Sequence, residues 1–457
     1  MNNVNKNITL HQKTYIWSII FEPLLFFVLI EAQNFIAIPF TVSRLLQLCV
    51  LLIFFFKTIY LFKIVIIKNS FSNFIILSFF NLTIYIILIS ILGLLSSHYS
   101  YKELADFWTG SRVYEGILGQ KNLRPAFEIF LFIYYFIYFV LIPQYVFKTS
   151  HHLNYFLKTF FRVAIIVIFL GILDSLSNII FNIDLIPRHL VDNRWVHMMW
   201  RFHSLCGEPR DAVVYLVFLL AIYSLYCSIN KKYISKKKIL LIMICIILTQ
   251  SVSGYVGIFL GLLGLSFLRL SVKNLFITLV SISLFILILL NLLELNAFHR
   301  ISNAYTAILM VPQYLETNSA LPKIILPQGP DIIPLWIIWL KINTFDLFHV
   351  IFGHGFGSAS FAINNFSNYF AGLNNPRSNL VRYLFEIGLF GTLIYTFIFF
   401  KPLYKIKSIF SKAYYNQIFF SSVLLFSASL THRSNLFLIF VGIILSIIIN
   451  KNIIKNK

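Results

Sequence analysis

Basic and acidic side chains concentrate in two segments of this sequence, each leading into an apolar run. The first segment covers residues 194–211 and contains Arg201, Glu208 and Arg210. Arginines bind diphosphate groups through paired N–H donors, and a carboxylate can take a proton from a hydroxyl nucleophile. The segment therefore predicts an anion site, with Arg201 and Arg210 binding the anion and Glu208 acting as a base.

A structural role is the alternative for this first segment. Pro209 and Asp211 suit the first turn of a helix, where a missing N–H is tolerated and a negative charge is favourable. Glu208 would then only cap that helix, and the arginines would belong to an ordinary charged loop.

The second segment joins a glycine-rich turn at 353–357 to charged residues further along the chain. His354 lies in the turn, and Arg377, Arg382 and Glu386 precede or open the next apolar run. The two arginines can bind an anion, and a histidine can serve as a base near neutral pH. The alternatives are structural, because tight turns need glycine and Arg382 can pair with Glu386 one helical turn later.

Metal and cofactor signals are missing from the sequence. The four cysteines form no CxxC pair, and no acid-rich cluster or nucleotide-binding loop is present. We therefore expect chemistry that uses neither a metal nor a cofactor. Glu22 and Asp174 interrupt apolar runs, where ionisable groups are usually functional or paired.

The composition places these segments in a membrane protein. Of the 457 residues, 59% are hydrophobic and 12% are charged, whereas a soluble domain carries about twice that charged fraction. Several uncharged runs reach the roughly 20 residues that a membrane span requires. We predict an all-α polytopic protein with one integral membrane domain over residues 1–457 and about twelve spans: 15–31, 41–56, 71–95, 128–147, 163–181, 212–229, 239–252, 254–268, 275–294, 382–400, 417–430 and 436–450.

Lysine and arginine in the connecting loops predict the orientation. With the N-terminus inside, the inner side carries 22 cations and no acid, and the 16 acids fall in spans or outside with the other 15 cations. Both termini are then cytoplasmic. This asymmetry explains the basic character of the chain, so we expect membrane lipids and no nucleic acid as partners.

The longest outer segment, 295–381, lies between the ninth and tenth predicted spans. It holds six of the 13 prolines and an apolar stretch at 335–340 that contains two tryptophans. Tryptophan favours the membrane interface, so we expect this stretch to lie there rather than cross.

Taken in order, these features resemble the O-antigen polymerase and O-antigen ligase superfamily. The resemblance covers residues 200–400 and consists of four motifs: Arg201, Ser204 and Pro209 before a span, a turn at 251–254, glycines at 353, 355 and 357 in a large outer loop, and the sequence Glu-Ile-Gly-Leu-Phe-Gly at 386–391. Two positions depart from the family. Gly254 replaces an arginine, and Arg377 stands where the ligase branch has a histidine, which favours a polymerase.

The resemblance implies an activity on the outer face of the bacterial inner (plasma) membrane. Such a polymerase joins oligosaccharide repeat units that are linked to undecaprenyl diphosphate, without a metal, during lipopolysaccharide or other polysaccharide biosynthesis. It implies diphosphate binding by Arg201, Arg377, Arg382 and Arg210, catalysis by Glu208 or His354, and a chain-length regulator protein as a further partner.

Three other functions remain open from the sequence. An O-antigen ligase would transfer the glycan to lipid A core or to a protein. A lipid-linked oligosaccharide flippase or other transporter would be expected to have paired halves and a polar path at mid-membrane, whereas polarity here collects in one outer loop. A transferase that uses polyprenyl-phosphate sugars would place acidic residues in its first outer loop, where Glu103 and Asp106 lie.

Overall fold

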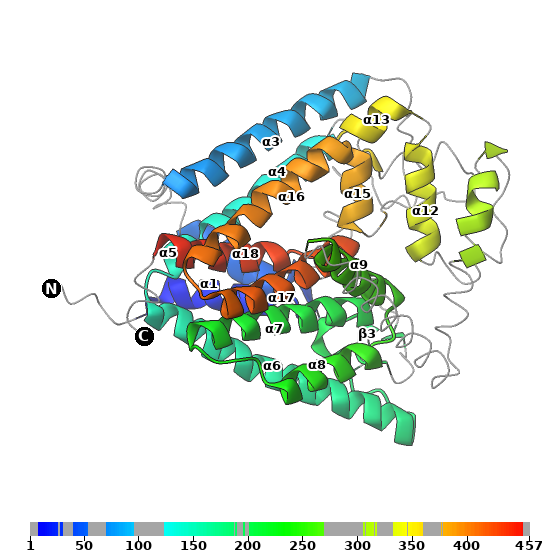
Figure 1. Cartoon of the computed structure of the whole chain (residues 1–457). Coiled ribbons are helices and arrows are strands. Elements are labelled where there is room, and N and C mark those ends of the chain that lie inside the picture. The colour runs from blue at the N-terminus through cyan, green and yellow to red at the C-terminus, as the bar shows by residue number, and fades with distance from the viewer. Residues whose placement is uncertain are drawn as a thin grey trace.

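The computed structural model describes most of the chain, and helices dominate it (Figure 1). The described residues are 8–25, 28–30, 40–53, 70–95, 123–186, 188–189, 195–196, 201–268, 305–306, 308–314, 316–317, 332–344, 346–359, 376 and 378–450. The predicted ninth span, 275–294, and Arg377 lie outside these residues, as do Glu103 and Asp106.

Long helices alternate with short turns along the described chain. The α-helices are Leu10–Phe21 (α1), Val42–Ile53, Ser70–Leu95 (α3), Leu123–Phe136 (α4), Pro143–Val146 (α5), Ser150–Phe181 (α6), Pro209–Ile229 (α7), Lys236–Leu248 (α8), Val252–Leu268 (α9), Ile332–Asn343 (α12), Leu347–Phe352 (α13), Asn379–Glu386 (α15), Gly388–Lys405 (α16), Lys412–Thr431 (α17) and Leu436–Ile449 (α18). Three single turns continue or precede them: Ile137–Leu141 (η2, a π-helix), Ser204–Cys206 (η3) and Ile406–Ser408 (η6).

Strands are few and short in the described part. Val28–Ile30 (β1) pairs antiparallel with Phe40–Thr41 (β2), and Arg188–His189 (β3) pairs antiparallel with Trp195–Val196 (β4). These two pairs lie in connections between helices, so the prediction of a helical architecture is confirmed.

The chain is a helical membrane protein. Five stretches of the described chain are long and apolar enough to cross a membrane: Ser70–Leu95, Leu123–Val146, Ser150–Phe181, Pro209–Ile229 and Gly388–Ser408. Three shorter apolar helices, Val42–Ile53, Ser253–Leu265 and Leu436–Ile449, pack with them. A helix suits these sequences because it satisfies every interior backbone N–H and C=O internally, where lipid offers no hydrogen bonds.

The first predicted span differs from the structure. The sequence predicts one span over 15–31, but α1 ends at Phe21 and the short strand β1 occupies Val28–Ile30. Pro23 explains the end of the helix, because proline has no N–H for the next helical hydrogen bond. Glu22 is therefore released from the helix into a polar environment.

The predicted break between two closely spaced spans is confirmed. Helix α8 ends at Leu248 and α9 begins at Val252. Gln250 between them has a left-handed backbone with φ 49°, a conformation that ends a helix. Gly254 packs its backbone against the side chain of Val213 on α7, so the position where the family has an arginine here holds two helices close together.

A central layer of helices forms the core. Helices α7, α17 and α18 run through the middle of Figure 1, with α3, α4 and α16 on one side and α6 and α8 on the other. Helix α17 packs on both α7 and α9, and α16 packs on α3 and α18. Nearly every side chain of α7 and α18 is buried, including the small polar Ser224 and Ser446. Apolar residues all round these two helices explain this position.

The tryptophan-containing stretch at 335–340 lies in α12, and its predicted position at the membrane interface stays a prediction. Trp336 Nε1 donates to Pro376 O at 2.9 Å and Trp339 Nε1 donates to Ala359 O at 3.0 Å. Both indole rings are buried, whereas Leu340 is exposed. Buried tryptophan needs such a partner for its N–H, and the two bonds fix α12 to later parts of the 295–381 segment.

The glycine-rich turn closes over the junction of α15 and α16. The N–H of His354 donates to Phe385 O at 3.0 Å, and the N–H of Gly355 donates to Glu386 O at 2.8 Å. Gly355 has φ +94°, and a Cβ there would lie 2.7 Å from Ser90 Cα. Only glycine tolerates this combination of backbone conformation and close contact, so the turn anchors α3 to the junction of α15 and α16.

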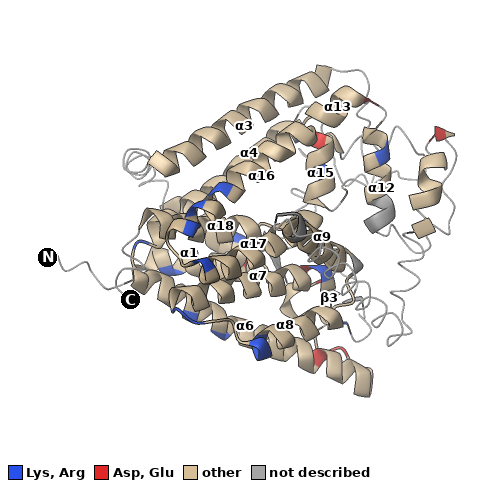
Figure 2. Cartoon of the chain, viewed as in Figure 1, with Lys and Arg blue, Asp and Glu red and all other residues tan. Residues whose placement is uncertain are grey.

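Charge is distributed unevenly along the helices. Figure 2 shows Lys and Arg gathered toward the side of the two termini, while Asp and Glu lie toward α13, α15 and β3. This separation is the one that the loop charges in the sequence predict.

Candidate functional site

Glu128 is the centre of a buried ion-pair cluster. Arg124 lies one turn earlier on α4, and its Nη2 is 2.8 Å from Glu128 Oε1. Arg382 Nη2 on α15 lies 3.0 Å from Glu128 Oε2, and its Nε lies 2.8 Å from Glu386 Oε2. Arg433 Nη2 lies 3.5 Å from Glu128 Oε1. Within these five residues, three arginines face two glutamates, so positive charge is in excess.

The members of this cluster differ in accessibility. The side chain of Arg382 is 9% exposed and that of Arg433 is 42% exposed. The guanidinium of Arg382 also lies 5.3 Å from the centre of the Phe356 ring, and Gly357 donates its N–H to Glu386 Oε1 at 3.0 Å. A buried charge is stable only with such partners. Arg382 is therefore fixed, whereas Arg433 keeps much of its surface open.

A cavity of about 360 Å³ lies beside the cluster. Aromatic rings and amides line part of its wall, among them Tyr135, Tyr383 and Asn379. Its charged wall combines three arginines, three carboxylates and one histidine: Arg44, Arg382, Arg433, Glu22, Glu128, Asp211 and His432. Such a cavity can bind an anion together with a polar, hydroxyl-rich molecule.

The connection between α17 and α18 joins three walls of this cavity. His432 Nε2 is bonded to Asp211 Oδ1 on α7, and Arg433 reaches Glu128 on α4. Asn435 Nδ2 donates to Glu22 Oε1 at 3.4 Å. This short connection thereby contacts the residue after α1, the second turn of α4 and the first turn of α7.

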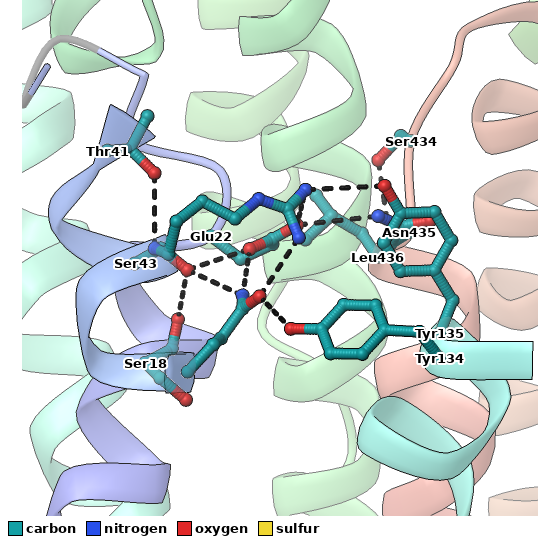
Figure 3. Close-up of polar contacts among 11 residues, drawn as sticks. Ser18, Glu22, Thr41, Ser43, Tyr134, Tyr135, Ser434, Asn435 and Leu436 are labelled. Carbon is teal, nitrogen blue, oxygen red and sulfur yellow. Dashed lines mark hydrogen bonds and ion pairs between the residues drawn. The ribbon is translucent and has the colours of Figure 1, made fainter. Parts of the chain in front are cut away.

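Glu22 accepts hydrogen bonds from the helix Val42–Ile53 and from the connection before α18, as Figure 3 shows. Arg44 Nη2 lies 3.4 Å from Oε1, while Ser43 Oγ and Gln47 Nε2 donate to Oε2 at 2.7 and 2.5 Å. Tyr134 donates its hydroxyl to Gln47 Oε1 at 2.5 Å. The carboxylate is thus fully engaged, so of the two expectations for an ionisable group in this apolar run, functional or paired, the structure shows the pairing.

Asp174, the other ionisable group within an apolar run, is also paired. It accepts the N–H of Ile186 at 2.8 Å and lies 3.7 Å from His203 Nδ1. These contacts connect α6 to Ile186 and to His203, which directly precedes η3.

Among the predicted site residues that the structure describes, Arg382 is the one that lines the cavity. Arg201 instead binds the turn after α8, with Nε donating to Thr249 O at 3.1 Å and Nη2 donating to Gln250 O at 2.9 Å. Its place in the diphosphate site stays a prediction, and so does that of Arg377.

Glu208 and Arg210 pair with each other away from the cavity lining. Arg210 Nε lies 2.6 Å from Glu208 Oε2. Glu208 occupies the position before the first residue of α7, but its side chain makes no capping hydrogen bond. The proposed roles of Glu208 as a base and of Arg210 as an anion ligand stay predictions.

The ring of His354, a residue of the glycine-rich turn, stacks with the rings of His349 and Phe385. Its ring centre is 4.2 Å from that of His349 and 4.3 Å from that of Phe385, and its Nε2 is 3.1 Å from Asn343 Oδ1. His349 Nδ1 is 2.6 Å from Asp346 Oδ2, and this hydrogen bond holds the pKa of Asp346 below its usual range. His354 does not line the cavity, and its catalytic role stays a prediction.

Most residues of the charged wall of the cavity were not predicted from the sequence. Asp211 was assigned only a helix start, and Glu128, Arg44, His432 and Arg433 carried no assignment. A usable signal was present at 432–435, where four polar residues in a row separate two apolar spans. Among the described residues, no group of three or more His, Cys, Asp or Glu side chains can hold a metal ion.

The cluster generates a stability prediction. We expect Glu128→Gln to lower the free energy of unfolding by about 3–5 kcal/mol, because it leaves buried arginines without a counter-charge. Glu316→Gln is the control, since its pair with Lys341 is exposed and such pairs contribute about 0.2–1 kcal/mol. Thermal unfolding of both purified variants in detergent measures the difference. Equal melting temperatures would show that the cluster does not hold the helices together.

No protein-family model matches the chain, and a search of curated proteins finds no significant match. The functional proposal therefore depends on the chemistry of the cavity and on the motifs that resemble a known superfamily.

Proposed function

We propose that the chain is a polysaccharide polymerase that joins oligosaccharide repeat units carried on undecaprenyl diphosphate. The observation that carries the proposal is the cavity itself, where Arg433 and Arg382 stand beside the His432–Asp211 pair. The reaction needs a cationic group to stabilise the departing diphosphate, without a metal, and a neighbouring group to accept a proton. The cavity supplies both.

Arg433 is the strongest candidate for binding the diphosphate. Its contact with Glu128 is the longest in the cluster, at 3.5 Å, and its side chain is 42% exposed. Binding an incoming anion therefore costs little rearrangement. Arg382 is held by Glu128 and Glu386, so it contributes a fixed positive field and keeps Glu128 oriented toward Arg433.

The rest of the cavity suits a glycan. Tyr135, Tyr383 and Asn379 line it together with the charged residues, and sugars offer hydroxyl groups for hydrogen bonds and C–H faces for contact with rings. Carboxylates on the same wall can accept hydrogen bonds from those hydroxyls.

The proposal includes the predicted topology of about twelve spans in the bacterial inner membrane, with both termini in the cytoplasm. The charge separation in Figure 2 supports it. Glu128, Asp211, Arg382 and the 431–435 connection all fall at outer ends of predicted spans, so the cavity would open outward, on the side of the 295–381 segment.

Cysteine labelling checks the orientation. In a background without the four native cysteines, we expect a membrane-impermeant maleimide to modify Ser319→Cys in intact cells but not Ser235→Cys. Ser235 precedes the lysines at 236–238 that begin α8, and positive loops stay inside. Both should react after the membrane is permeabilised. Labelling of Ser235→Cys alone in intact cells would reverse the topology.

Substitution of Arg433 checks the activity. We expect Arg433→Ala to weaken binding of the lipid-linked repeat unit by about 10–100-fold, since a hydrogen bond to a charged group contributes about 1.5–3 kcal/mol. Arg433→Lys should restore part of it, because lysine keeps the charge but lacks the planar pair of donors. Arg162→Ala, at an exposed position of α6, is the control.

The assay uses purified protein and measures both donor binding and the length of the glycan product. Normal polymer from Arg433→Ala would contradict the assignment of the diphosphate site. Transfer of the glycan to lipid A core without polymer would indicate a ligase, and donor binding without bond formation would indicate a transporter.

A further inference from the structure

His432 and Asp211 form a hydrogen-bonded pair between two distant parts of the chain. Asp211 lies in the first turn of α7, and His432 directly follows α17. Nε2 of His432 is bonded to Oδ1 of Asp211, and the two side chains are 12% and 14% exposed, respectively. Both residues line the cavity, so the pair is sheltered but reaches the space where a substrate would bind.

The bond to Asp211 selects the tautomer of the neutral imidazole. An ionised carboxylate only accepts hydrogen bonds, so the proton between the two residues lies on Nε2. Nδ1 of the neutral ring then carries the lone pair. Within the described part of the chain, the hydrogen bond of the His432 ring is the one from Nε2 to Asp211, and Nδ1 has none. A carboxylate that orients a histidine in this way also stabilises the imidazolium formed when the ring takes up a proton.

The carboxylates in the cavity are less suited to accept a proton. Glu22 accepts hydrogen bonds from Ser43 and Gln47 and pairs with Arg44. Glu128 is shared among three arginines. Hydrogen bonds and cations that favour the charged form of a carboxylate make it a weak base.

We propose that His432 is the general base that activates the acceptor hydroxyl and that Asp211 is its positioning residue; this rests on the proposed function. Nδ1 of His432 takes the proton of the acceptor hydroxyl as its oxygen bonds to the anomeric carbon of the donor. The bond from that carbon to the diphosphate oxygen breaks, and the diphosphate leaves with the electron pair. The imidazolium then returns its proton to solvent, so the histidine is regenerated.

The order of residues in the connection supports this division of roles. His432 and Arg433 are consecutive, so their Cα atoms lie about 3.8 Å apart. Their side chains reach different walls of one cavity, His432 toward α7 and Arg433 toward α4. The same short connection thus presents the base to the acceptor and the cation to the leaving diphosphate.

The test compares His432→Gln with Glu208→Gln, the variant of the carboxylate that the sequence favours as base. We expect His432→Gln to lower kcat by about 100–10,000-fold, the usual contribution of a general base, with unchanged melting and donor binding. Asp211→Asn should also lower kcat, and Asp211→Glu should restore part of the loss. His151→Gln, at an exposed position near the start of α6, is the control and should keep wild-type turnover. Glu208→Gln tests the alternative base directly.

The outcomes are distinct. Wild-type turnover by His432→Gln overturns the proposal while leaving the proposed function intact. Turnover lost in Glu208→Gln but kept in His432→Gln would assign the base to Glu208. Reduced melting or donor binding in His432→Gln that accounts for the whole loss would make the pair a structural link between α7 and α17. A wild-type protein that neither binds nor extends the lipid-linked donor overturns both proposals.

Discussion

The burial of Glu128 among three arginines is the interaction on which the arrangement of the helices depends. A lone carboxylate between apolar helices would cost several kcal/mol. Here α4 supplies the carboxylate and one arginine, α15 supplies Arg382 and the connection after α17 supplies Arg433. The positions of these elements are therefore constrained, because each charged side chain must reach Glu128. The glycine-rich turn extends this constraint, because Gly357 donates to Glu386, the second partner of Arg382.

Charges that serve structure and charges that can serve chemistry lie side by side in this cluster. Arg382 has two carboxylate partners and an aromatic ring, so its role is to hold the other groups in place. Arg433 contacts Glu128 alone within this cluster, at 3.5 Å from each carboxylate oxygen, and its side chain is open. The excess positive charge of the cluster therefore lies on Arg433, which faces the cavity. A diphosphate site requires a cation in that position. A similar contrast holds for the groups that could accept a proton. The carboxylates of Glu22 and Glu128 are occupied by several donors, whereas His432, among the described residues, has one bonded ring nitrogen, which contacts Asp211.

Much of the fold was predictable, and less of the site. Apolar runs and loop charges predicted helices such as α3 and α7 and the turn between α8 and α9, and they left Glu22 and Asp174 as either functional or paired. The end of α1 was missed because the apolar run continues past Pro23, and the hydrogen bonds of Trp336 and Trp339 were missed because their partners lie further along the chain. Of the predicted site residues, Arg382 alone of those described lines the cavity. The others follow local motifs, whereas the cavity joins residues as distant as Asp211 and His432, whose meeting depends on how α7 packs against α17.

The central claim is that the cavity at Arg433 receives the diphosphate of a lipid-linked glycan. An experimental structure of the full chain in lipid nanodiscs, with undecaprenyl diphosphate bound, tests it most directly. The account predicts phosphate oxygens within hydrogen-bonding distance of the Arg433 guanidinium, on the side of the cavity that also presents His432. A diphosphate bound instead at Arg201 or between Glu208 and Arg210, with the cavity empty, would contradict it.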